Sequence, residues 1–221
     1  MTEPERPGYL PRMTRSERDQ FRLLLAVALL AIGLLLMPFP GSLSVVVTRS
    51  VVSGFSEVPE VGLLSEVALS VLALAVVAAL LIARPWRSHR RVPILAAVIG
   101  VPVAYVTSEL AKLALAQPRP CSRWTAAVEC PPPGDWSLPS NHAVLAFAAA
   151  VVVAFALRRL WLTWLAVALA IVVSAGRVMQ GAHYLHDVAA GALLGIALPL
   201  ALAVAAATIA QRTTFRSSPA G

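Results

Sequence analysis

Six long apolar stretches restrict this chain to folds that place most of its residues in a membrane. Hydrophobic residues make up 58% of the 221 residues and charged residues only 13%, whereas a soluble domain carries about a quarter charged residues. A helix needs about 20 apolar residues to cross a bilayer, with about 17 as a practical minimum. The fourth and fifth stretches are short by this measure. The six cover 21–39, 61–83, 92–116, 142–157, 160–176 and 188–210.

We therefore predict an all-α protein, a single bundle of six transmembrane helices over 21–210. Alanine and valine dominate the stretches, and small side chains suit close packing between membrane helices. The first stretch is interpreted as a retained helix, because it follows a polar tail and lacks a clear signal-peptide cleavage site. Residues 1–20 and 211–221 are charged or rich in proline and serine, which predicts two disordered cytoplasmic tails.

The placement of basic residues predicts the orientation of the bundle. Thirteen of the 18 Lys and Arg lie in the two tails and in alternate loops, at 6–22, 84–91, 158–159 and 212–216. Cytoplasmic loops carry the excess of positive charge in membrane proteins, so both termini are expected in the cytoplasm. Membrane orientation thus accounts for the net charge of +7, and no nucleic-acid partner is expected.

Three short motifs carry the candidate chemistry. The first is Lys112, the only lysine of the chain, followed after six residues by Arg119 and Pro120. The second is the run 139–142, Pro-Ser-Asn-His, and the third spaces Arg177, His183 and Asp187 by five and three residues. In the predicted topology the third and fifth helices end outside and the fourth and sixth begin outside. All three motifs then meet at one extracytoplasmic face.

The set of motifs resembles the lipid-phosphatase superfamily built around type 2 phosphatidic acid phosphatases, which shares its site with vanadium haloperoxidases and some acid phosphatases. Two positions depart from the family pattern, which usually has glycine where this chain has Asn141 and serine where it has Gly176. Glycine adopts positive φ more readily than asparagine, so the first departure concerns the backbone of the phosphate cradle.

The resemblance implies a metal-independent phosphatase without a cofactor. In this reading His183 is the nucleophile that forms a phosphohistidine, Asp187 lies one helical turn away and orients it, and His142 is the general acid and base. Fixed cations and N–H donors would stabilise the phosphoryl group in the transition state. The residues expected to bind that phosphate are Lys112, Arg119, Ser140, Asn141 and Arg177.

Several nearby residues have competing interpretations. His186 is a rival nucleophile that breaks the motif spacing. Arg123 could meet a second phosphate or simply lie on the surface. Glu109 could orient Lys112 or serve helix packing, and Glu66 has no predicted partner, although a carboxylate within a membrane helix often marks a function.

The two cysteines, Cys121 and Cys130, lie in the outer loop 117–140. An oxidising exterior and an even count favour a disulfide over free thiols.

The sequence therefore predicts a multi-pass enzyme of the bacterial plasma membrane that removes phosphate from a lipid phosphate at the extracytoplasmic face. A polyprenyl diphosphate, a phosphatidylglycerol phosphate and phosphatidic acid all fit, and the partners expected are this substrate and membrane lipids. One alternative is a lipid phosphotransferase with the same site residues. Another is a transporter or scaffold without enzymatic activity, although a transport path needs polar groups near the membrane midplane.

Overall fold

The protein is a bundle of helices in a computed structural model that describes residues 14–35, 42–58, 60–83, 90–127 and 129–216. No strand occurs among these residues, so the all-α prediction is confirmed. The helices are α1 (Arg15–Leu35), α2 (Leu43–Phe55), α3 (Glu60–Ala83), α4 (Arg91–Leu115), the short 3₁₀ helix η2 (Pro120–Ser122), α5 (Asn141–Leu157), α6 (Leu160–Met179) and α7 (Leu185–Arg216).

Each of the six apolar stretches lies within or largely overlaps one helix. Among the described residues, α3, α4, α6 and α7 are long and apolar enough to cross a membrane, which supports a multi-pass membrane protein. The count of six spans and the cytoplasmic termini stay predictions. Helix α1 already begins at Arg15 and α7 continues to Arg216, so parts of both predicted tails are helical. Residues 1–13 and 217–221 lie outside the described part.

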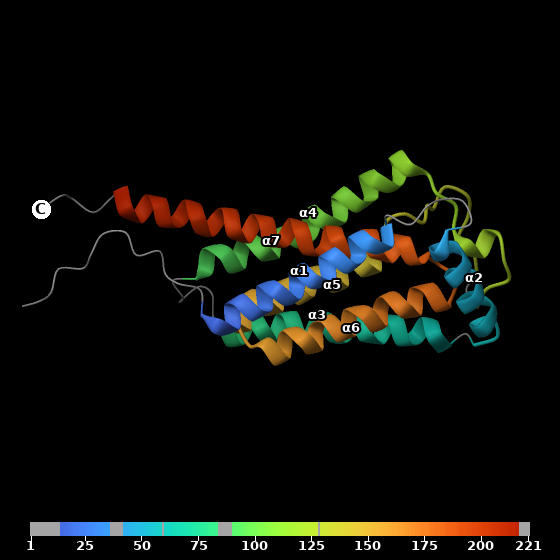
Figure 1. Ribbon diagram of the computed structural model, residues 1–221, viewed down its shortest axis with the longest axis horizontal. Helices are drawn as coiled ribbons and strands as arrows, with labels where there is room; N and C mark the ends of the chain where they lie inside the picture. Colours follow the sequence, from blue (N-terminus) through green and yellow to red (C-terminus); the bar gives the residue numbers. More distant parts are fainter. Residues whose placement is uncertain (1–13, 36–41, 59, 84–89, 128, 217–221) are drawn as a thin grey trace, which may run out of the picture.

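Helix α2 was not predicted, because it lies between the first two apolar stretches, 21–39 and 61–83. Its 13 residues are too few to cross a membrane, and it lies across the end of the bundle, at the right in Figure 1. Two of its hydroxyls cap α7. Ser44 Oγ accepts the backbone N–H of His186, and Thr48 Oγ1 accepts that of Leu185, both at 3.0 Å. Helix N-termini expose N–H groups that need such acceptors.

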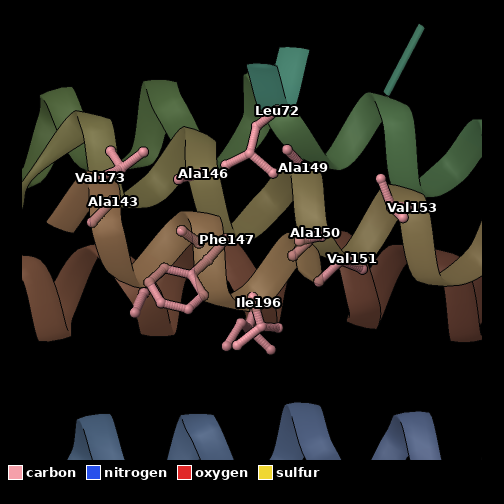
Figure 2. Close-up of a cluster of buried hydrophobic side chains, with 14 of the residues drawn as sticks. Leu72, Ala143, Ala146, Phe147, Ala149, Ala150, Val151, Val153, Val173 and Ile196 are labelled. Atoms are coloured by element: carbon pink, nitrogen blue, oxygen red, sulfur yellow. The ribbon is translucent and has the colours of Figure 1, made fainter. Parts of the chain in front are cut away.

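Helix α5 forms the centre of the bundle. Twelve of its 17 residues are buried, as expected for a helix that is apolar on all sides. In Figure 2 its small side chains meet Leu72 of α3, Val173 of α6 and Ile196 of α7. These contacts fix α5 against α6 and α7, which carry the third motif, and against α3.

A close contact between α5 and α7 sets the register of the site. A Cβ built on Gly195 would lie 2.4 Å from the carbonyl oxygen of Val144, so only glycine permits this approach. Two turns earlier in α7, the backbone N–H of Ser140 donates to the carbonyl oxygen of Asp187 at 3.0 Å. The second and third motifs are thereby tied together through the backbone.

The predicted meeting of helix ends is confirmed. Helices α4 and α6 end, and α5 and α7 begin, at the same end of the bundle, at the right in Figure 1. The loop from 116 to 140 and helix α2 lie at this end as well.

Candidate active site

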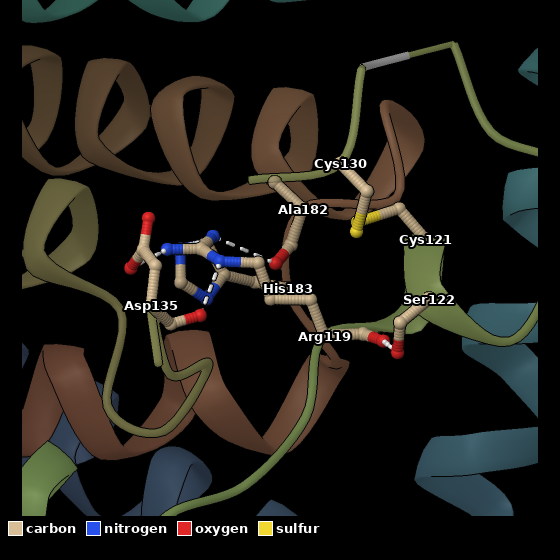
Figure 3. Close-up of a disulfide and its surroundings, with 7 residues drawn as sticks. All are labelled: Arg119, Cys121, Ser122, Cys130, Asp135, Ala182 and His183. Atoms are coloured by element: carbon tan, nitrogen blue, oxygen red, sulfur yellow. Dashed lines mark hydrogen bonds and ion pairs between the residues drawn. A yellow bond between two sulfur atoms is a disulfide. The ribbon is translucent and has the colours of Figure 1, made fainter. Parts of the chain in front are cut away.

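His183 lies in the bend between α6 and α7 and is only 2% exposed. Its Nδ1 lies 2.8 Å from the carbonyl oxygen of Ser137, and its Nε2 lies 3.3 Å from NH1 of Arg119. A carbonyl only accepts a hydrogen bond and a guanidinium only donates one. Nδ1 therefore carries the proton, and the lone pair of Nε2 faces Arg119, as Figure 3 shows.

The pKa of His183 is lowered to about 4, chiefly by burial and also by the positive charges of Arg119 and Arg177, against the opposing effect of Asp187. The ring is therefore neutral at pH 7. A neutral imidazole beside fixed cations has the electronic state that a nucleophile toward phosphorus requires.

Asp187, which we predict to orient His183, is fully buried and lies beyond hydrogen-bond distance of the His183 ring. Its Oδ2 lies 3.6 Å from Nδ1 of His183, and the carboxylate instead accepts the Ser137 hydroxyl, the backbone N–H of Tyr184 at 2.7 Å and Nε2 of Gln117 at 2.9 Å. The prediction assumed one helical turn between the two residues, whereas His183 precedes α7. Ser137 thus joins the two residues, because its hydroxyl donates to Asp187 and its carbonyl oxygen accepts from His183.

Arg119 is a buried cation with four partners. It donates to the carbonyl oxygens of Asp135 and Ala182 at 3.1 and 3.0 Å, to Oδ1 of Asp135 at 2.7 Å, and to His183. Figure 3 shows the nearby disulfide between Cys121 and Cys130. This disulfide closes the loop that follows Arg119.

His186, the rival histidine, lies against Asp187, with its Nε2 3.3 Å from Oδ1 of that carboxylate. Its ring is 2% exposed, stacks on Tyr184 with centroids 5.1 Å apart, and bonds Ser44 at 2.8 Å and Gln117 at 2.9 Å. These partners give His186 a structural role that joins α2, α7 and the loop from 116 to 140.

Ser140 and the start of α5 supply open donors. Ser140 is fully buried, its Oγ has no hydrogen-bond partner among the described residues, and it does not cap α5. The first N–H groups of a helix attract anions. The N-terminus of α5 is thus available to a phosphate, whereas that of α7 is already capped.

Lys112 belongs to a hydrogen-bonded group that includes Glu109 and Asn141. Its Nζ lies 3.0 Å from Oε1 of Glu109, and the same oxygen accepts Nδ2 of Asn141. Ser108 donates to Oδ1 of Asn141 at 2.8 Å. The Asn141 side chain thus binds α4, and only its backbone remains to meet a phosphate. Among the described residues only Ala116 and Arg158 are non-glycine residues with positive φ, so this position needs no glycine.

Glu66 of α3 is a site residue that sequence reasoning left without a partner. Its Oε1 lies 2.9 Å from Nε2 of His142 and 3.4 Å from NH1 of Arg177. These partners follow 76 and 111 residues later in the chain, so no local spacing could have revealed them.

Arg123 is exposed at the end of η2, and its charge acts on Tyr184. A contact with a second phosphate stays a prediction. Within the described ranges, no group of three or more His, Cys, Asp or Glu side chains is placed to hold a metal ion.

Comparison with known proteins identifies the family. A family model described as the PAP2 superfamily matches residues 93–211, more than half of the chain. The chain belongs to the PAP2 superfamily. All predicted phosphate-binding and catalytic residues lie within the PAP2 match, and Glu66 lies before it.

Two individual proteins are similar to this PAP2 chain. An undecaprenyl-diphosphatase of Sulfolobus acidocaldarius is 38% identical over 100 residues, which are 44% of this chain and 48% of that protein. The match thus spans about half the length of this relative. The first transmembrane PAP2 type phosphatidylglycerolphosphate phosphatase from Bacillus subtilis has a crystal structure that is 15% identical, with a TM-score of 0.46 over 94% of this chain and 100% of that chain.

Proposed function

We propose that this protein is a metal-independent lipid phosphatase that acts at the extracytoplasmic face of a bacterial plasma membrane. The observation that carries the proposal is the arrangement of His183, which is neutral, presents Nε2 to Arg119 and has Nδ1 tied to Ser137. Membership of the PAP2 superfamily supports the same chemistry.

The reaction begins when the lone pair of Nε2 of His183 forms a bond to phosphorus. The bond from phosphorus to the ester oxygen breaks with its electron pair, and His142 gives a proton to that oxygen. A water oxygen then attacks the phosphohistidine, its proton passes to His142, and the electron pair of the N–P bond returns to Nε2.

In this proposal three cations stabilise the charge that develops during the reaction. Lys112, Arg119 and Arg177 supply them, and Ser140 and the first N–H groups of α5 add donors. Preorganised donors of this kind supply most of the stabilisation in phosphoryl transfer. They provide the positive charge that a metal ion supplies in other phosphatases.

The substrate proposed is a lipid with a small phosphate or diphosphate headgroup. The site lies at the ends of apolar helices, so a lipid anchored in the bilayer would present its phosphate at the right depth. The names of the two similar proteins include a polyprenyl diphosphate and a phosphatidylglycerol phosphate as substrates, and phosphatidic acid shares their chemistry.

The test is phosphate release by the purified protein in detergent micelles. Undecaprenyl diphosphate, phosphatidylglycerol phosphate and phosphatidic acid are compared with glucose 6-phosphate, and His183→Asn is the inactive control. We expect release from at least one lipid, inhibition by vanadate and no effect of EDTA. Faster release from the sugar phosphate would contradict the lipid assignment, and loss in EDTA that magnesium restores would contradict the metal-free mechanism.

A further inference from the structure

Glu66 comes from a helix outside the region matched by the family model, yet it touches two residues of the site. One oxygen, Oε1, accepts from both His142 Nε2 at 2.9 Å and Arg177 NH1 at 3.4 Å. The Glu66 side chain is 55% exposed, whereas those of His142 and Arg177 are 25% and 14% exposed. A partly exposed carboxylate thus joins a more buried histidine to a more buried cation.

A close approach of α3 to α6 brings Glu66 to this place. A Cβ built on Gly176 would lie 2.8 Å from Cβ of Ser65 and 3.1 Å from the carbonyl oxygen of Val61. The Ser65 hydroxyl also donates to the carbonyl oxygen of Val173 at 2.9 Å. The family pattern usually has serine at the position of Gly176. Because glycine has no side chain, α3 can approach α6 here, and this approach places Glu66 at the site.

We propose that Glu66 is a positioning residue for the general acid, one that fixes the His142 ring and presents its second nitrogen to the leaving oxygen. The proposal rests on the proposed phosphatase function. A protonated imidazole has two N–H donors. Glu66 accepts the hydrogen bond from Nε2–H of His142. The Nδ1 atom of His142 makes no hydrogen bond to any residue that the structure describes. The Nδ1 proton is therefore the one that passes to the leaving oxygen.

Arg177 keeps donors for the phosphate in this arrangement. Glu66 takes NH1, whereas the Nε of Arg177 is buried and has no partner within the described residues. When the bond from phosphorus to the ester oxygen breaks, the oxygen takes the electron pair and the proton from Nδ1. His142 is then neutral, still held by Glu66, and ready to accept a proton from the attacking water.

Loss of Glu66 should therefore affect poor leaving groups more than good ones. General acid catalysis contributes typically 10²–10⁴-fold, and it matters where an unstable alkoxide would otherwise depart. Phosphatidic acid releases an alkoxide, whereas 4-nitrophenyl phosphate releases a stabilised phenolate. A merely structural role of Glu66 would affect both substrates equally.

The experiment measures kcat/KM for these two substrates with wild type, Glu66→Gln and Gly176→Ser. The ratio of the two values from one sample does not depend on how much of the protein is folded. We expect Glu66→Gln to lower kcat/KM about 10²-fold for phosphatidic acid and less than about threefold for the nitrophenyl ester. Gly176→Ser should shift the ratio in the same direction, because it separates α3 from α6.

The control is Glu60→Gln, since Glu60 is exposed in the first turn of the same helix. It should leave the ratio unchanged. Equal losses on both substrates, or no loss on either, in Glu66→Gln would overturn the proposal. Failure of the wild type to hydrolyse any lipid phosphate would instead contradict the phosphatase function, and the wild-type measurement alone reveals it.

Discussion

The carbonyl oxygen of Ser137 accepts the hydrogen bond from Nδ1 of His183 at 2.8 Å. The loop backbone therefore selects the ring tautomer. The buried carboxylate of Asp187 contributes by holding the Ser137 hydroxyl. This division of roles separates the expected effects of changes at the two motif positions.

Asp187→Asn should lower turnover less than it would in a site where the carboxylate binds the histidine directly. Direct contact makes such a change cost about 10⁴-fold. Here the Ser137 carbonyl keeps the tautomer, so we expect about 10²-fold or less in kcat, together with a lower melting temperature. A loss as large as that of His183→Asn, in a protein of unchanged thermal stability, would contradict this arrangement.

The two histidines of the third motif should separate chemistry from stability. His183→Asn should lower kcat at least about 10³-fold, because the attacking atom is gone. His186→Ala should keep most of the turnover and lose about 1–3 kcal/mol of stability, since the hydrogen bonds of its ring to Ser44 and Gln117 are lost. Turnover and thermal unfolding of the two variants test this, and an inactive, stable His186→Ala would reverse the assignment.

The protein should lose stability when the pH is lowered, because of His183. Its pKa is about 4 in the folded protein against 6.5 ordinarily. Between these values the unfolded chain binds a proton that the folded chain does not, so stability is complete above pH 6.5 and is lost as the pH falls toward 4. From pH 7 to pH 5 the loss is about 2 kcal/mol. Unfolding measurements should show it in wild type relative to His183→Asn, and parallel pH curves would contradict it.

Arg177→Lys should impair catalysis even though it keeps the charge. A lysine cannot donate to Glu66 and a phosphate oxygen from one planar fork. We expect kcat to fall by about 10-fold or more, with a smaller change in KM, which marks an interaction made mainly in the transition state. Kinetics close to wild type would remove Arg177 from the site.

The disulfide between Cys121 and Cys130 should stabilise the outer loop rather than the bundle. A loop this short contributes roughly 2–3 kcal/mol in the chain-entropy model. We expect no thiol labelling before reduction, and faster proteolysis within 117–140 after it, at unchanged helix content by circular dichroism. Ready labelling of the unreduced protein would contradict the disulfide.

The sequence was sufficient to predict the helices that consist of long apolar stretches. Helix α2 was missed because its 13 residues, although apolar on average, form a stretch too short to be predicted as a membrane span. Its role depends on Ser44 and Thr48 meeting α7, across more than 130 residues of sequence. Hydropathy indicates which segments avoid water. It does not indicate which distant backbone N–H groups will donate a hydrogen bond to a hydroxyl.

The motif residues around His183 could be predicted because their spacing is local. The carboxylates that bind the cations of the site could not be predicted. Glu66 of α3 binds Arg177 of α6, Asp135 binds Arg119 across the outer loop, and the carboxylate bonded to Lys112, Glu109, also binds Asn141. Such contacts depend on the packing of whole helices, as Gly176 illustrates, and no single-sequence spacing encodes them.

The capping of α7 by α2 has a consequence for anyone who transplants this catalytic centre. Two amide groups at the start of α7 depend on hydroxyls from a helix that is too short to count as a membrane-spanning segment. A chimera assembled only from the membrane-spanning segments and motif loops would carry every catalytic side chain. It would also leave the His186 amide beside Asp187 without an acceptor, and loosen the turn that carries His183. Residues 43–55 therefore belong to the smallest transferable unit.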